Sequence, residues 1–130
     1  MRDIVNNVSF AHSLTRQTIA TDDTILGSAV DLLGFLGAQV TFETGTVTDG
    51  DYVVTLLESD DNSTYTTVAA GDLQGSFPAS IVAADDNKVY DVGYNGKKRY
   101  IKISVVSDNT MTGAVVECFV IRGAPRHAPV

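Results

Sequence analysis

The sequence predicts an all-β protein, a jelly-roll-like β-sandwich of about eight strands with extended N- and C-terminal arms. β-Branched residues are abundant, with 17 valines and 14 threonines among 130 residues, and these stiff side chains pack well on a pleated surface. Short runs that alternate apolar and polar residues are separated by turn residues, which is typical of sandwiches. By contrast, no stretch carries the apolar period of an amphipathic helix.

The strands are expected over residues 14–20, 28–33, 38–43, 52–58, 65–69, 88–94, 99–107 and 114–122. The first two of these are the weaker candidates. The run 38–43 alternates most cleanly, with every second residue apolar and therefore inward. Glycine and aspartate within residues 45–50 then predict a turn before the strand 52–58.

Strands 52–58 and 65–69 are expected to be the two arms of a hairpin. The residues 59–63 between them are Ser, Asp and Asn, whose side chains hydrogen-bond to their own backbone in tight turns. Residues 70–86 are irregular and contain two glycines and a proline. A single helical turn is expected near residues 69–73.

Asn95-Gly96 predicts a two-residue turn, because both residue types tolerate a positive φ. This turn is expected to connect strand 88–94 to strand 99–107, in which every second residue is isoleucine or valine. The strand 114–122 is apolar on both faces. It is therefore expected at the centre of a sheet or at a contact between subunits.

A length of 130 residues suits a single domain over residues 1–130. Residues 1–13 are expected to form an N-terminal arm and residues 14–122 the sandwich body. Residues 123–130 are expected to form a C-terminal tail. Because prolines in the tail lack a backbone donor, the tail is expected to lie along a surface and to add no strand.

Charge and hydropathy exclude several classes of function. The net charge is −7 and the pI about 4.5, whereas a nucleic-acid-binding protein needs a basic face. No apolar run approaches the length of a membrane span. The charge is uneven, since residues 1–87 hold two basic and 13 acidic groups and residues 88–130 hold seven basic and three acidic groups. The basic third suits an acidic partner surface, although a mixed, solvated surface is the simpler interpretation.

Cys118 is the single cysteine and has no partner for an internal disulfide, so it is expected to be a small core residue. The first ten residues are polar and lack the apolar stretch of a secretory signal. The chain is therefore expected to be made in a cytoplasm and kept there, or assembled there into a larger particle.

Catalytic chemistry has little support in the sequence. His12 and His127 both lie in the predicted arms, whereas a nucleophile–base pair or a zinc site needs rigidly held groups at short range. The chain is therefore expected to be no enzyme and to bind no cofactor. A calcium site is an alternative if five turn residues meet at one end of the sandwich, but self-capped turns are the simpler interpretation. These residues are Asp49, Asp51, Asp60, Asp61 and Asn62.

Lys97, Lys98 and Arg99 form a basic cluster that Tyr94 and Tyr100 flank. Three interpretations are open. The cluster is a solvated turn, an ion-pairing contact with an acidic neighbour, or a site that stacks and pairs with single-stranded nucleic acid. Three charges seldom outweigh an acidic body, which disfavours nucleic acid.

Four stretches of the sequence are characteristic in combination. They are Leu57-Glu58-Ser59-Asp60-Asp61-Asn62-Ser63, Val68-Ala69-Ala70-Gly71-Asp72-Leu73, Gly93-Tyr94-Asn95-Gly96-Lys97-Lys98-Arg99-Tyr100 and Arg122-Gly123-Ala124-Pro125-Arg126-His127-Ala128-Pro129-Val130. Over about residues 30–130, the chain resembles a family of small virion proteins of tailed bacteriophages, encoded close to the major capsid protein. This resemblance implies a structural role without enzymatic motifs, as a decoration or cement protein on the outside of the capsid.

The resemblance implies the major capsid protein as a partner, and the apolar strand 114–122 suggests self-association as a dimer or trimer. No contact with nucleic acid or with a membrane is expected. Both ends of the chain are expected to grip neighbouring subunits, because extended arms gain contact area from few residues. The predicted partner-contact residues are Arg122, Pro125, Arg126, His127, Pro129, Val130, Lys97, Lys98 and Arg99. Among them, Arg126 offers a two-pronged contact to a carboxylate.

Two alternatives to capsid decoration stay open. The chain is compatible with another virion position, such as the neck, the tail or a receptor-facing fibre domain. It is also compatible with a soluble ligand-binding β-sandwich module.

Overall fold

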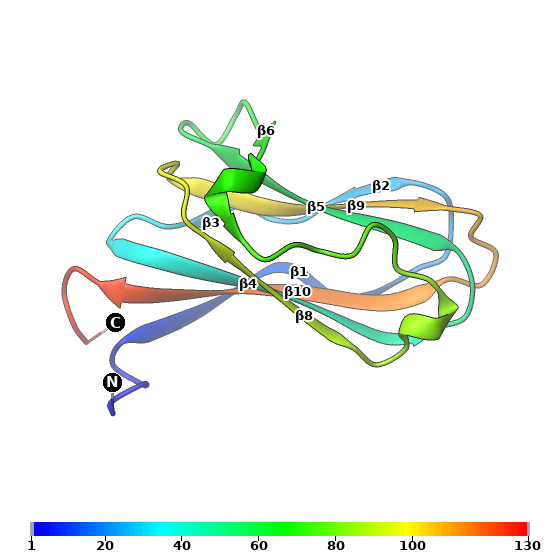
Figure 1. Ribbon diagram of the computed structural model, residues 1–130, viewed down its shortest axis with the longest axis horizontal. Coiled ribbons are helices and arrows are strands. Elements are labelled where there is room, and N and C mark those ends of the chain that lie inside the picture. Colours follow the sequence, from blue (N-terminus) through cyan, green and yellow to red (C-terminus); the bar gives the residue numbers. More distant parts are fainter. Residues whose placement is uncertain (1, 130) are drawn as a thin grey trace.

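The computed structural model describes residues 2–129 as two antiparallel β-sheets that face each other across a hydrophobic core (Figure 1). The strands are β1 (Val8–Ile19), β2 (Thr24–Leu26), β3 (Val30–Asp31), β4 (Phe35–Val47), β5 (Asp51–Ser59), β6 (Thr66–Thr67), β7 (Leu73–Gln74), β8 (Val89–Tyr94), β9 (Tyr100–Asp108) and β10 (Ala114–Pro125). Two short 3₁₀ helices, η1 (Ala70–Asp72) and η2 (Ala83–Asp85), lie between β6 and β8. The predicted all-β sandwich is confirmed.

The strands of each sheet follow a jelly-roll order. The first sheet is β1-β10-β4-β8-β7 and the second is β2-β9-β5-β6, with β3 also paired to β9. With the two short strands β3 and β7 set aside, the sheets read β1-β10-β4-β8 and β2-β9-β5-β6. This is the order of an eight-stranded jelly roll, in which most neighbours in a sheet are far apart in sequence.

The inner faces of the two sheets supply the core. The apolar residues predicted to point inward at alternate positions of residues 38–43 and 99–107 are buried or half-buried there, which confirms the alternation in these two segments. The fully buried apolar members of these two strands are Val40, Phe42, Ile101, Ile103 and Val105. Cys118 is also a buried core residue, as expected.

β10 lies inside the first sheet, because it pairs with β1 on one side and β4 on the other. This confirms the central position that its two apolar faces predict. The inner side chains of Val116 and Val120 are buried in the core. On the outer face, the ring of Phe119 packs against that of Phe10, with 6.0 Å between centroids.

The prediction of an N-terminal arm over residues 1–13 is wrong for its second half. β1 begins at Val8 and pairs with β10 from Val8–Gly123 to Ile19–Ala114. β1 is an edge strand, so many of its side chains stay exposed and its sequence lacks a clean apolar alternation.

The C-terminal tail begins later than the predicted residues 123–130. β10 continues to Pro125, which lies opposite Phe35 of β4, so the start of the tail does extend a strand. Proline fits here because it is the last residue of the ladder, where a missing donor costs little.

Asn95 and Gly96 do not form the predicted two-residue turn. β8 belongs to the first sheet and β9 to the second, so residues 95–99 cross from one sheet to the other. Neither Asn95 nor Gly96 has a positive φ. Gly96 serves close packing instead, because a Cβ atom there would collide with the ring of Tyr94.

The remaining elements agree with the predictions in part. The hairpin of 52–58 and 65–69 is confirmed as β5 and β6, although β6 has two residues only. The helical turn near 69–73 is confirmed as η1. The strand expected over 28–33 shortens to β3, and the turn expected over 45–50 starts later, since β4 continues to Val47.

Candidate functional site

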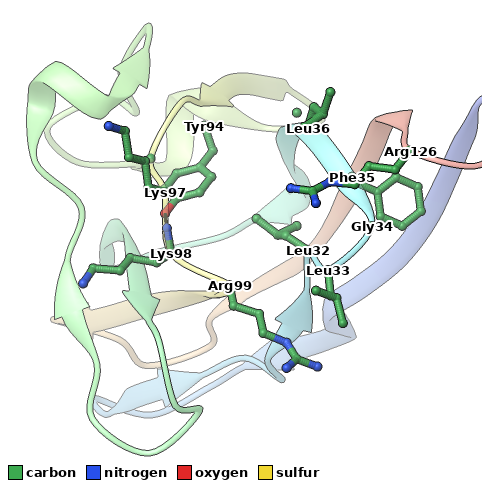
Figure 2. Close-up of a pocket in the computed structure, with 12 residues that line it drawn as sticks. Leu32, Leu33, Gly34, Phe35, Leu36, Tyr94, Lys97, Lys98, Arg99 and Arg126 are labelled. Atoms are coloured by element: carbon green, nitrogen blue, oxygen red, sulfur yellow. Dashed lines mark hydrogen bonds between the residues drawn. The ribbon is translucent and has the colours of Figure 1, made fainter.

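A hollow of about 370 Å³ opens at one end of the sandwich. It is lined by residues 32–37 at the start of β4, by Tyr94 and residues 96–99 of the crossover to β9, and by Arg126. We call this site the end hollow (Figure 2). The start of β4 and both marked chain ends lie toward the same end of the molecule (Figure 1).

The loop that leads into β4 forms one wall of the end hollow. Gly34 has a φ of +91°, a left-handed conformation that glycine adopts without strain. The amide of Phe35 donates to the carbonyl oxygen of Leu32 (3.0 Å), and the amide of Arg126 donates to that of Gly34 (2.8 Å). The loop and the start of the tail are therefore held together.

Arg122 holds this loop from the side of β10. Its Nη1 donates to the carbonyl oxygen of Asp31 (3.0 Å) and its Nη2 to the hydroxyl of Ser9 (2.7 Å). Its guanidinium carbon lies 4.9 Å from the ring centroid of Phe35. The head of Arg122 is thus engaged within the chain, where it positions the start of β4.

Two of the four cations around the end hollow are paired with carboxylates of the same chain. Arg99 binds Asp31 with two prongs, Nε to Oδ1 at 2.9 Å and Nη2 to Oδ2 at 2.8 Å. These hydrogen bonds lower the pKa of Asp31 and raise that of Arg99. Lys98 pairs with Asp60, which raises the pKa of the lysine. For Lys98 and Arg99, the acidic neighbour that the sequence suggests is therefore a carboxylate of the same chain.

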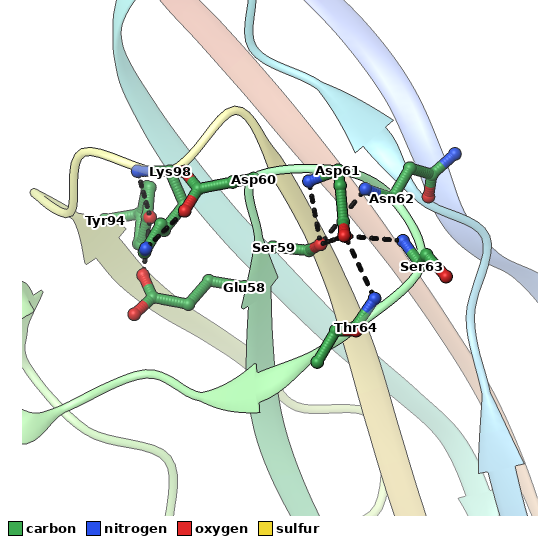
Figure 3. A network of polar contacts seen from close by, with 9 residues as sticks. All are labelled: Glu58, Ser59, Asp60, Asp61, Asn62, Ser63, Thr64, Tyr94 and Lys98. Atoms are coloured by element: carbon green, nitrogen blue, oxygen red, sulfur yellow. Dashed lines mark hydrogen bonds and ion pairs between the residues drawn. The ribbon is translucent and has the colours of Figure 1, made fainter.

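Tyr94, which lines the end hollow, connects it to the ion pair of Lys98 and Asp60 (Figure 3). Its hydroxyl donates to Glu58 Oε2 (2.6 Å) and accepts the amide of Lys98 (3.2 Å). Burial and the hydrogen bond to the Glu58 carboxylate raise the pKa of Tyr94. The crossover from β8 to β9 is therefore fixed against the end of β5.

Lys97 and Arg126 form no ion pair with any residue in 2–129. Both are exposed. In Figure 2 the guanidinium of Arg126 points toward the middle of the end hollow, and Lys97 stands on the opposite rim. Leu33 and Leu36 add an apolar rim, since 65% and 71% of their surfaces are exposed. This site combines unpaired positive charge with exposed apolar surface.

The structure brings most of the predicted partner-contact residues to one end of the molecule. Lys97, Lys98, Arg99 and Arg126 line the end hollow itself. Arg122 and Pro125 contact or pair with Phe35 in its wall. His127 and Pro129 follow as exposed residues without a described contact, and Val130 lies outside the described residues.

The sequence interpretation missed the wall of residues 32–37. Gly34-Phe35-Leu36-Gly37 resembles no known motif, since it lacks the Gly-Lys-Ser/Thr that completes a phosphate loop. The signal in the sequence that indicates this wall is two leucines, Leu33 and Leu36, each followed directly by a glycine. Single exposed apolar side chains are common on any surface, but exposed apolar side chains that cluster among polar ones are typical of interaction sites.

A second, apolar hollow of about 300 Å³ lies on the outer face of the first sheet, over β1 and β10. It is lined by Phe10, Ala11, His12 and Phe119, and the rings of His12 and Phe119 meet edge-on at 6.4 Å. This face lies where the sequence suggests a contact with a sister copy. Self-association stays a prediction.

The residues considered for calcium do not meet. Asp49 lies before β5 and Asp61 after it, so a strand of nine residues, roughly 27 Å long, separates them. Asp49 accepts the amides of Met111, Thr112 and Gly113, and Asp61 accepts those of its own turn. Among residues 2–129, no group of three or more His, Cys, Asp or Glu is placed to hold a metal ion. The same range contains no helix with the length and hydropathy needed to cross a membrane.

The fold has counterparts among solved structures. No family model and no curated protein matches the sequence. The PBSX exported protein XepA has a TM-score of 0.59 and 19% identity over 92% of this chain. The SPBc2 prophage-derived protein YomS has a TM-score of 0.54 and 14% identity over 94% of this chain and 100% of its own. The present chain spans 38% of the length of XepA. At these identities the likeness concerns the fold.

Proposed function

We propose that this chain is a structural virion protein of a tailed bacteriophage, which decorates and stabilises the capsid from outside by bridging subunits of the major capsid protein. It acts in this proposal by binding alone and catalyses no reaction. The resemblance over residues 30–130 supports it. So does the fold shared with YomS, which is named as prophage-derived.

One observation carries the proposal. Residues from three distant parts of the chain, the loop 32–37, the crossover 96–99 and the tail at Arg126, meet in one exposed, basic and apolar site. A chain with a net charge of −7 gains no folding advantage from gathering exposed leucines beside unpaired cations. Such a site is suited to contact another protein.

The architecture fits a protein that adds contacts without chemistry. The sandwich keeps the end hollow preformed, so little conformational entropy is lost when a neighbour binds. The amide of Arg126 donates to Gly34, and the guanidinium of Arg122 donates to Asp31. These hydrogen bonds hold the loop that forms the wall in place. A preformed surface of this kind adds binding free energy across a seam between capsid subunits.

Particle composition tests the proposal. In purified, nuclease-treated phage particles, quantitative mass spectrometry is expected to find the chain at a copy number comparable to that of the major capsid protein. Purified chain is also expected to rebind to capsids from which it has been stripped. A few copies per particle indicate the neck or tail, and absence from particles leaves a soluble binding module; either result contradicts decoration.

A further inference from the structure

β4 lacks a strand neighbour on one side at its start. Its ladder with β10 runs to the pair Phe35–Pro125, but its ladder with β8 stops at Ala38–Tyr94. After Tyr94 the chain leaves the first sheet and crosses to β9. Within residues 2–129, residues 35–37 therefore have a strand partner on the β10 side only.

The end hollow occupies the space that a longer β8 would fill. Residues 35–37 form its wall on one side, and Tyr94 with residues 96–99 borders the other (Figure 2). A Cβ atom added at Gly37 would meet nothing within 4 Å, so the face of the strand is uncrowded there, and on its edge no β8 residue pairs with it. An uncovered strand edge in a hollow is a template for one more strand.

The charges around this edge select the chemistry of the added strand. Asp31 and Asp60 already neutralise Arg99 and Lys98, whereas Lys97 and Arg126 have no carboxylate partner within residues 2–129. Arginine binds a carboxylate with two parallel hydrogen bonds. Leu33 and Leu36 offer apolar contact beside these cations.

We propose that the end hollow binds an extended acidic segment of a neighbouring protein, which lies along residues 35–37 as a short added strand. This inference rests on the proposed function, because it names the kind of segment that the decorated partner presents. Main-chain hydrogen bonds to the edge of β4 at residues 36–37 hold the segment, since the amide of Phe35 already donates to Leu32. Carboxylates of the segment contact Arg126 and Lys97, and its apolar side chains pack on Leu33 and Leu36.

The same observations disfavour nucleic acid as the occupant. Phosphate backbones bind through many cations, and two unpaired ones on a chain of net charge −7 form a weak site. The aromatic ring of Tyr94 is largely buried, and its hydroxyl is engaged with Glu58, so it offers no exposed face for a base. An open strand edge, by contrast, recognises a peptide backbone.

A designed peptide tests the inference on the full-length chain. The probe is a blocked peptide of roughly eight residues, about 26 Å when extended, that alternates glutamate and leucine. In an NMR titration, amide shifts are expected at residues 32–37 and 96–99 and at Arg126. The double variant K97A/R126A is expected to bind at least tenfold more weakly. The variant R16A/K102A removes two cations elsewhere and is expected to bind like the unmodified chain.

Two altered peptides test the two parts of the inference separately, the charge of the bound segment and its main-chain pairing with β4. A peptide with lysine in place of glutamate is expected to leave the spectrum unchanged. A glutamate peptide with alternate backbone amides methylated keeps its charge but cannot complete a ladder, so it is expected to bind at least tenfold more weakly.

Several results would overturn the inference. They are equal binding of the methylated peptide, equal binding by K97A/R126A, preference for a single-stranded oligonucleotide, or no amide shifts at the end hollow with millimolar peptide. Amide spectra of each variant confirm that it is folded. The copy number in particles is measured without the peptide, so a failure of this inference is distinguishable from a failure of the proposed function.

Discussion

Ser13 shows how a single buried hydroxyl joins the two sheets. Its Oγ accepts the buried amide of Ile103 in β9 (3.0 Å) and donates to the carbonyl oxygen of Ser28 (2.9 Å). Its own carbonyl oxygen accepts the amide of Ser28. Gly27 lies so close to Ser13 that no Cβ atom would fit. Ser13 therefore adds polar contacts between the edge strand β1 and the opposite sheet to the apolar packing of Leu14 and Ile19 in the core.

Replacing Ser13 with alanine is expected to lower the free energy of unfolding by about 1–3 kcal/mol, because the Ile103 amide stays buried without an acceptor. Urea denaturation followed by circular dichroism measures the change. Thr15→Ala, at an exposed position of the same strand, is the control and is expected within about 0.5 kcal/mol of the unmodified chain. Equal stability of both variants contradicts this role of Ser13.

At the scale of elements, aspartates shape the connections between strands. Asp61 accepts the amides of Ser63 and Thr64 and the hydroxyl of Ser59 in the β5–β6 connection. These hydrogen bonds lower its pKa to about 2. The carboxylate of Asp49 accepts three amides of the β9–β10 connection, and its pKa is lowered as well. Both turns depend on an ionised carboxylate.

Acid is therefore expected to weaken the fold through these turns. The folded-state pKa of Asp61 lies below its ordinary value of 3.8, so its contribution to stability is complete above about pH 4 and is lost as the pH falls toward 2. Thermal melting between pH 7 and pH 2 is expected to show a smaller acid-induced drop in Tm for Asp61→Asn than for the unmodified chain. Parallel curves for the two proteins down to pH 2 would show that this turn does not set the acid sensitivity.

At the scale of the whole molecule, the jelly-roll order joins segments that are far apart in sequence. β10 pairs with β1 and β4, and β9 pairs with β5 and β2. Within residues 2–129, β5 and β6 form the one hairpin among the eight main strands. Most strand pairs therefore form only after a long loop has closed.

Refolding is expected to take milliseconds to seconds, as in other sandwiches dominated by non-local pairs. The chain has five tyrosines and no tryptophan, and Tyr52 and Tyr94 are buried. Tyrosine fluorescence in stopped-flow dilution from urea therefore reports the formation of the core. Completion within microseconds would contradict a transition state that requires these distant contacts.

Local pattern predicted much of the body of the molecule and little of its ends. The alternation of β4 and β9 and the apolar faces of β10 identified the core strands, because burial on one face imposes a period of two. The edge strand β1 was not recognised over residues 8–13, since an exposed edge imposes no such period. Asn95-Gly96 carried a turn signal, but the crossover between sheets overrode it.

The candidate site, too, was predictable from the sequence only in part. The sequence by itself determined an all-β chain, its core residues, and the basic residues Lys97, Lys98, Arg99 and Arg126 as candidates for contact. The tertiary structure alone decided that these residues meet residues 32–37, that Asp31 and Asp60 neutralise two of them, and that β4 begins with an open edge. The reason is physical: side-chain periodicity is local, whereas the register between distant strands decides which loops share an end of the sandwich.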